Sequence, residues 1–165
     1  MKTDKELTTD KKNIFSTDEL LKLDNQLCFA LYVSSKEIIR KYKPFLDPLG
    51  LTYTGYITLM ALWETDNITV KNLGKKLYLD SGTLTPLLKK LETLGYLERT
   101  RSISDERNVY VTLTSKGYEL KSAVVHIPRE LICSSSIDVE NALQLLPILR
   151  QFMKQIADET KRSPS

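Results

Sequence analysis

Five leucines recur along residues 84–94 at a spacing that predicts an amphipathic helix. They occupy positions i, i+3, i+4, i+7 and i+10, which form one apolar stripe at 3.6 residues per turn. Asp80 and Ser81 precede the stripe and offer side-chain oxygens to the free N–H groups of a first helical turn. Gly95 follows it and favours the left-handed backbone that ends many helices. A helix is therefore expected from Asp80 to Leu94.

Two β-compatible segments follow this helix, with a polar turn between them. The first covers residues 96–101, and the second, residues 109–113, alternates as VYVTL. Residues 102–108 suit the tip of a hairpin. A helix that begins with small hydroxyl side chains can enter the DNA major groove, and a basic hairpin beside it can reach the phosphate backbone or the minor groove. The pattern predicts a helix with a wing.

The rest of the chain is mainly helical by the same criterion. We expect helices over residues 17–43, 53–64, 71–79, 114–131 and 138–159, and a short strand over residues 68–70. Residues 132–137 are expected to form a loop. Prolines should bend or break the ends of the first and fourth of these helices and weaken the prediction of the last. They are Pro44, Pro48, Pro128 and Pro147.

These elements predict a mainly α-helical fold with a small β-wing, a winged helix-turn-helix. Residues 1–16 lack periodicity and are expected to be a disordered arm, and residues 17–165 a single domain. Within it, residues 53–114 would form the DNA-binding part. The helices in residues 17–50 and 115–160 are too long and too apolar for that part to cover, so we expect them to dimerise. A two-fold dimer would place two recognition helices about 34–36 Å apart, on a pseudo-palindromic site.

The positive charge gathers where this arrangement would meet phosphates. The chain has a net charge of +3, and the span from Lys71 to Arg107 holds eight basic and five acidic residues, so the whole excess lies there. A solvated charged face is the alternative reading of the same pattern.

Composition excludes several other classes. With 41% hydrophobic and 27% charged residues, the chain has an ordinary soluble composition. No apolar run approaches the roughly 18 residues of a membrane span, and no secretory signal is evident, so a cytoplasmic protein is expected. Two cysteines 105 positions apart and one histidine do not form a metal motif. Without a P-loop, a GxGxxG motif or a hydrolase elbow, we expect neither an enzyme nor a cofactor.

Three stretches resemble the MarR family of winged-helix regulators, and within it the organic-hydroperoxide-resistance regulators. They are residues 23–64, residues 77–99, which contain LYLDSGTLTPLLKKLE, and residues 105–117, DERNVYVTLTSKG. The resemblance covers about residues 20–159. It implies a homodimeric repressor that releases its DNA operator when an organic hydroperoxide oxidises Cys28. It also implies that Tyr42 and Tyr53 belong to the thiol site across the subunit interface, with Tyr32 lining it.

The resemblance further implies a second cysteine and a set of residues that face DNA. Cys133 matches the cysteine that resolves the oxidised thiol in some members, although a small-molecule thiol is the other route. The DNA-facing residues are Ser81, Thr83, Thr85, Pro86, Lys89, Lys90, Arg99, Arg101, Asp105 and Arg107. From the residues alone, the hydroxyls are equally helix-capping groups and the wing residues a solvated loop.

The same residues also fit other functions. Cys28 by itself suits an inert small hydrophobic residue, and the tyrosines suit core positions. A regulator answering to a non-covalent ligand, or a broader thiol-based virulence or biofilm regulator, is the main alternative. A thiol peroxidase would need an arginine beside its cysteine in a thioredoxin-like layout, which the sequence lacks. A winged helix used only for protein contacts would show no salt-sensitive affinity for DNA.

Overall fold

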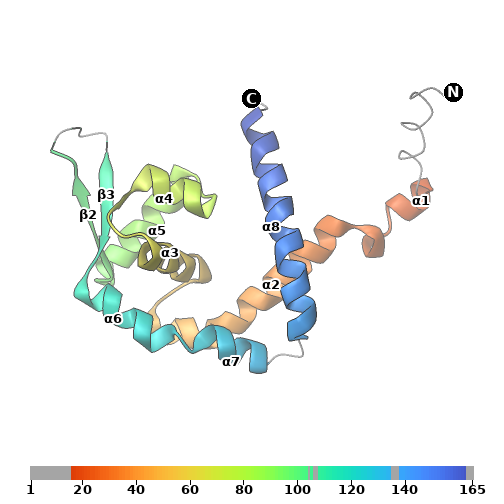
Figure 1. Cartoon of the computed structure of the whole chain (residues 1–165), viewed down its shortest axis with the longest axis horizontal. Helices are drawn as coiled ribbons and strands as arrows, with labels where there is room; N and C mark the ends of the chain where they lie inside the picture. Colours follow the sequence, from red (N-terminus) through yellow and green to blue (C-terminus); the bar gives the residue numbers. More distant parts are fainter. Residues whose placement is uncertain (1–15, 104, 106–107, 135–137, 163–165) are drawn as a thin grey trace.

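The computed structural model describes residues 16–103, 105, 108–134 and 138–162. Its α-helices are α1 Thr17–Leu20, α2 Leu27–Leu46, α3 Tyr53–Glu64, α4 Val70–Leu77, α5 Ser81–Thr93, α6 Ser115–Val124, α7 Ile127–Cys133 and α8 Val139–Arg162 (Figure 1). Two 3₁₀ turns are η2 Leu23–Asn25 and η3 Asp47–Leu49, and the strands are β1 Ile68–Thr69, β2 Leu97–Arg101 and β3 Val109–Leu113. The predicted class, a mainly helical winged helix-turn-helix, is confirmed.

The strands form one antiparallel sheet in the order β1-β3-β2. The hairpin of β2 and β3 pairs Leu97 with Leu113 and Arg101 with Val109. The short strand β1 pairs Ile68 with Val111 on the other side of β3. This strand ends one residue before the expected position, because the Thr69 hydroxyl accepts the N–H of Asn72 and begins α4.

The core lies where α3 meets α4, α5 and the sheet. Leu59 and Leu62 of α3 are fully buried, as the near-continuous apolar character of that segment predicts. The leucine stripe of α5 also faces this core, with Leu84, Leu88 and Leu91 buried. Burial of such side chains supplies the main stabilisation of the domain, at about 25 cal/mol per Å² of apolar surface.

The prediction of one long helix over residues 17–43 is wrong, because α1 ends after one turn. Ser16 and Glu19 form a capping box that closes this turn at its start. At its end, the side-chain amides of Asn25 and Gln26 donate to the carbonyl oxygens of Glu19 and Leu20. Those carbonyl groups would otherwise continue the helix. The helix resumes at Leu27 and runs past Pro44 to Leu46.

The fourth predicted helix, residues 114–131, is divided into α6 and α7. Pro128 lies in the first turn of α7, where its missing N–H costs no helical hydrogen bond, and α6 has already ended at Val124. The expected loop at 132–137 is also wrong at its start, since Cys133 is the last residue of α7. Helix α8 continues through Pro147.

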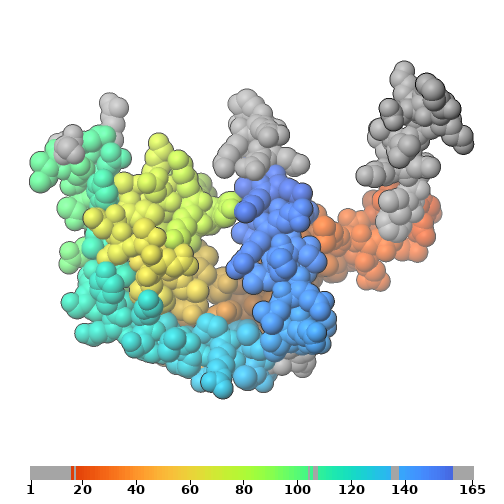
Figure 2. All heavy atoms as spheres, in the orientation of Figure 1, coloured from red at the N-terminus to blue at the C-terminus, as the bar shows by residue number. Residues whose placement is uncertain are grey.

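Two helices project from the winged part of the molecule. Figure 1 shows α2 and α8 extending away from the α3–α6 region, and Figure 2 shows a hollow between α8 and the yellow-green surface of α4. The arm expected at residues 1–16 lies outside the described residues except for Ser16, which caps α1.

Candidate DNA-binding surface and thiol site

The turn between α4 and α5 holds the two helices in a fixed geometry. Tyr78 adopts a left-handed backbone with φ of 55°, and its N–H donates to the carbonyl oxygens that end α4. A Cβ atom on Gly74 would lie 2.9 Å from the carbonyl oxygen of Leu79, so only glycine lets the turn approach α4 this closely. The short connection makes α4 and α5 a helix-turn-helix pair.

Asp80 begins α5 as its N-cap. Its carboxylate accepts the backbone N–H of Thr83 at 2.9 Å and the Thr83 hydroxyl at 2.9 Å. These hydrogen bonds, led by the backbone N–H, hold the pKa of Asp80 below its usual value. The carboxylate is therefore ionised at neutral pH and satisfies the positive end of the helix.

The exposed face of α5 carries all the helix residues that were predicted to face DNA. They are Ser81, Thr83, Thr85, Pro86, Lys89 and Lys90. The Thr85 hydroxyl donates to the carbonyl oxygen of Ser81 at 2.7 Å. A hydroxyl that donates once keeps lone pairs for a second partner, so the capping role and a DNA contact are compatible.

The predicted wing residues differ in their surroundings. Arg101 is exposed on β2. Arg99 is half-buried in a salt bridge with Glu92 of α5. Asp105 accepts the side-chain N–H of Asn108 at 3.0 Å, which helps to close the hairpin tip. Arg107, and the pairing with Asp105 expected for it, lie outside the described residues.

The C-terminal end of α5 has a partner that the sequence did not indicate. Lys116 Nζ donates to the carbonyl oxygen of Leu94 at 2.7 Å and lies 4.8 Å from the centre of the Tyr96 ring. A cation at this position stabilises the negative end of the helix. The contact joins residues 22 positions apart, so no local pattern could reveal it.

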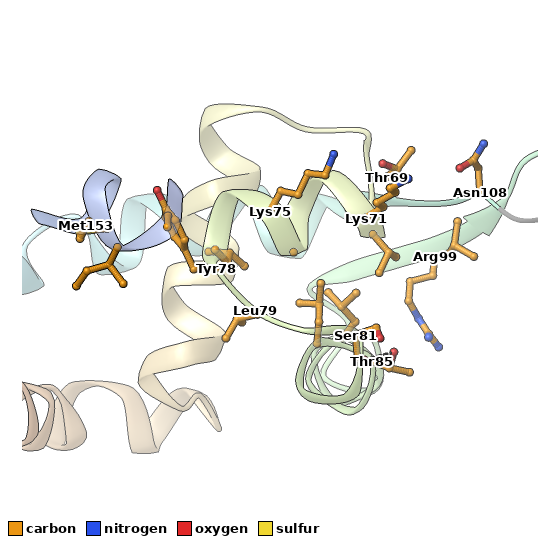
Figure 3. A pocket seen from close by; sticks show the side chains of 18 residues that line it. Thr69, Lys71, Lys75, Tyr78, Leu79, Ser81, Thr85, Arg99, Asn108 and Met153 are labelled. Carbon is orange, nitrogen blue, oxygen red and sulfur yellow. Dashed lines mark hydrogen bonds between the residues drawn. The ribbon is translucent and has the colours of Figure 1, made fainter. Parts of the chain in front are cut away.

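A groove of about 1310 Å³ lies between the winged part and α8. Figure 3 shows Lys71, Lys75 and Tyr78 on the α4 side of the groove and Met153 on the α8 side. The lining is mostly apolar with cationic side chains at its edge. Sequence reasoning did not find this groove, because its existence depends on where α8 lies.

Two of the three tyrosines of the predicted thiol site, Tyr42 and Tyr53, come together at the junction of α2 and α3. The ring centres of Tyr42 and Tyr53 are 4.9 Å apart, and Tyr56, which was not predicted, lies 5.9 Å from Tyr42. Burial, followed by the neighbouring Tyr53, raises the pKa of Tyr42 above its usual value. Tyr42 is therefore a neutral hydroxyl that can donate a hydrogen bond at physiological pH.

Cys28 lies at the opposite end of α2 from Tyr42. It is the second residue of the helix and is exposed, and Tyr32 follows one turn later on the same side. Fourteen residues separate Cys28 from Tyr42 along one helix, which corresponds to about 21 Å at 1.5 Å per residue. Within one chain, the structure does not bring the sulfur to the tyrosine pair.

Cys133 is also exposed, at the C-terminal end of α7. Figure 1 shows that this end of α7 lies away from the N-terminal end of α2, which carries Cys28. Disulfide formation needs Cα atoms within about 7 Å, so the two cysteines of one chain do not meet in this arrangement.

Within the described residues, no three His, Cys, Asp or Glu side chains gather as a metal site would require. None of the helices in that part of the chain combines the length and the apolar character that crossing a bilayer requires.

Comparison with known proteins identifies the family. Residues 40–124 match the family model described as transcriptional regulator SarA/Rot. The transcriptional regulator SarZ of Staphylococcus saprophyticus is 47% identical over 133 residues, which cover 81% of this chain and 91% of SarZ. The organic hydroperoxide resistance transcriptional regulator of Bacillus subtilis is 46% identical over 136 residues, covering 82% of this chain and 92% of that protein.

Solved structures of AbfR, a protein of Staphylococcus epidermidis, have the same fold. Reduced AbfR bound to DNA has a TM-score of 0.71 and 34% identity, covering 86% of this chain and 99% of AbfR. A disulfide-formed AbfR structure has a TM-score of 0.61 and 36% identity, covering 85% of this chain and 96% of AbfR. These matches confirm the resemblance seen in the sequence. The chain belongs to the SarA/Rot family of MarR-like winged-helix transcriptional regulators.

Proposed function

We propose that this regulator is a homodimeric repressor that binds a pseudo-palindromic operator and releases it when an organic hydroperoxide oxidises Cys28. One observation carries the proposal. The exposed Cys28 lies about 21 Å along α2 from Tyr42, so only a second copy can place the Tyr42–Tyr53 pair beside the sulfur. The similarity to a regulator named for organic hydroperoxide resistance supports the choice of effector.

The exposed apolar surface supports a dimer. Helices α2 and α8 project from the winged part, and both carry large side chains that water reaches in a single chain (Figure 1). They include Leu27, Phe29, Tyr32, Ile38 and Ile39 on α2, and Leu143, Leu145, Leu146, Ile148 and Met153 on α8. Monomeric soluble proteins rarely expose an apolar surface of this extent, and an isologous interface would bury it in both copies.

DNA contact would be made by α5 and the wing. The exposed hydroxyls of Ser81 and Thr85 suit base edges in the major groove, and Lys89 and Lys90 suit phosphates. Arg101 on β2 suits the backbone or the minor groove. The DNA-bound AbfR structure supports DNA as the partner of this fold.

The chemistry at Cys28 would begin from the thiolate. Its sulfur attacks one oxygen of the peroxide, the O–O bond breaks, and the leaving alkoxide takes a proton to become an alcohol. Cys28 is then a sulfenic acid. The hydroxyls of Tyr42 and Tyr53 in the partner subunit would donate hydrogen bonds to the sulfur, and their rings would keep the site apolar enough for a lipophilic peroxide.

Cys133 of the partner subunit is the proposed resolving residue. Its thiol would attack the sulfenic sulfur, form the S–S bond and release water. The disulfide-formed AbfR structure supports this route. If the two Cα atoms lie more than about 7 Å apart in the reduced dimer, the helices must move to form the disulfide. That movement would change the distance between the two recognition helices and release the DNA.

A gel shift on the DNA upstream of the protein's own gene tests the proposal. Wild-type protein should bind this DNA and release it when cumene hydroperoxide is added. Cys28→Ser should bind equally well and stay bound in the peroxide. Release of the Cys28→Ser variant by peroxide would show that Cys28 is not the sensor.

The groove beside α8 supports a second candidate, a regulator controlled by a non-covalent ligand. Its volume of about 1310 Å³ and its mostly apolar lining with Lys71 and Lys75 at the edge suit an organic anion. In that case, Cys28→Ser would keep its full response to the effector.

A further inference from the structure

A salt bridge fastens the wing to the last turn of α5. Arg99 of β2 donates to Glu92 Oε2 through Nε at 3.0 Å and through Nη2 at 2.5 Å. The backbone N–H of Arg99 donates to the second carboxylate oxygen, Oε1, at 3.1 Å. Glu92 therefore binds both the side chain and the main chain of one residue of β2.

The pair lies on the side of α5 that also carries its hydroxyl residues. Glu92 follows Thr85 by seven residues, which is two helical turns along the same face. Figure 3 shows the Arg99 side chain running from β2 toward α5, and it lines the same groove as Ser81 and Thr85. The two side chains are 24% and 35% exposed, so water screens their attraction only in part.

The rest of the connection between α5 and the wing lies at the base of the hairpin. It consists of the turn at residues 94–96, the buried side chains of Leu97 and Val111, and the pairing of β1 with β3. Beyond this base, β2 and β3 run outward to an exposed tip as two strands, and a two-strand hairpin can change its angle to the helix unless side chains hold it. An arginine–carboxylate pair with two N–H donors fixes both the distance and the relative orientation of the two elements it joins. The backbone hydrogen bond of Arg99 adds a third point of contact between β2 and α5.

We propose that Glu92 and Arg99 are positioning residues that set the angle between α5 and the wing, so that both reach one DNA site. Arg99 then acts through Glu92, and it does not serve as a phosphate contact of its own. The inference rests on the proposed DNA contacts of α5 and the wing. It predicts a result that simple electrostatics does not. Removing the negative charge of Glu92 weakens DNA binding, although fewer acidic groups near DNA would otherwise strengthen it.

The experiment compares Glu92→Gln, Arg99→Met, the double variant and Glu98→Gln with the wild type. Affinity for the upstream DNA is measured by fluorescence anisotropy at several salt concentrations, and thermal unfolding is followed by circular dichroism. Glu98→Gln is the matched control, because it removes the same charge from an exposed side chain of the same strand.

The proposal expects Glu92→Gln and Arg99→Met each to lose affinity by about fivefold. The double variant should be no weaker than the weaker single variant, and Glu98→Gln should bind as well as or better than the wild type. The slope of log affinity against log salt should stay unchanged in Arg99→Met, because no phosphate contact is lost.

Four results would overturn the inference. Glu92→Gln could bind as tightly as the wild type, or the losses of the two single variants could multiply in the double variant. The salt slope of Arg99→Met could fall by about 0.9, the value for one phosphate contact. A variant unfolded at the assay temperature would show that the pair holds the domain together and does not orient the wing. A wild-type protein that fails to bind the DNA would instead contradict the proposed function itself.

Discussion

Tyr42 and Tyr53 lie with their ring centres 4.9 Å apart, although one is near the end of α2 and the other begins α3. The 3₁₀ turn at Asp47–Leu49 and the left-handed Gly50 reverse the chain between them. The reversal makes a pair of half-buried hydroxyl-bearing rings at a helix junction. In the proposed dimer, this pair receives the sulfur of Cys28 from the other subunit.

Tyr53→Phe should slow the oxidation of Cys28 without weakening DNA binding by the reduced protein. The variant keeps the ring and removes one hydroxyl donor, and losing a hydrogen bond to a charged sulfur should cost about tenfold in rate. The rate is measured as the loss of free thiol in a Cys133→Ser background after addition of cumene hydroperoxide. Tyr118→Phe is the control, because that hydroxyl donates to Asp66. An unchanged rate in Tyr53→Phe would remove the tyrosine pair from the thiol site.

Peroxide should join two chains covalently through Cys28 and Cys133. The end of α7 that carries Cys133 lies away from the N-terminal end of α2 that carries Cys28, so we expect a disulfide between these cysteines to join two subunits (Figure 1). On a non-reducing gel, the oxidised wild type should migrate as a dimer, and each single cysteine variant as a monomer. Co-expressed Cys28→Ser and Cys133→Ser chains should regain one cross-link. A wild type that stays at monomer mass would point to a small-molecule thiol as the resolving partner.

Leu143→Asp should weaken the dimer by about tenfold or more, because it would bury a charge in the proposed interface of α8. The measurement is light scattering after size-exclusion chromatography across a concentration series. Val125→Asp is the matched control. The Val125 side chain is 73% exposed, similar to the 65% of Leu143, but Val125 lies directly after α6 and outside the proposed interface of α8. If both variants dimerise like the wild type, α8 does not form the interface.

Asp80→Ala should lower the melting temperature by about 2–5 °C at neutral pH, because α5 loses its N-cap. The pKa of Asp80 is depressed in the folded protein by the N–H of Thr83. The ionised Asp80 carboxylate therefore stabilises the folded protein above its unfolded-state pKa of about 4. This stabilisation is lost as the pH falls through the pKa of Asp80 in the folded protein. The difference between the two proteins should shrink below about pH 4. Asp80→Asn, which keeps the acceptor oxygen, should melt close to the wild type at neutral pH. If the difference in melting temperature between Asp80→Ala and the wild type stayed constant with pH, Asp80 would not act as an ionised N-cap.

The local elements of this protein follow from residues that are close together in the chain. The spacing of leucines in α5, the cap at Asp80 and the alternation in β3 depend on residues within a few positions of one another, and the structure contains them where expected. The same local reasoning placed one helix across residues 17–43. It failed there because the side chains of Asn25 and Gln26 reach back to close α1, a contact that periodicity does not contain.

Contacts between residues far apart in the chain depend on the complete fold. Tyr56 joins the pair of Tyr42 and Tyr53, Lys116 reaches the end of α5, and the groove beside α8 depends on how a helix from the end of the chain is placed. The same holds for Arg99, which the sequence marked as a DNA contact and the fold pairs with Glu92. The physical reason is that helical and strand periodicity act over a few residues, whereas these contacts form when packing of the core brings separate elements together.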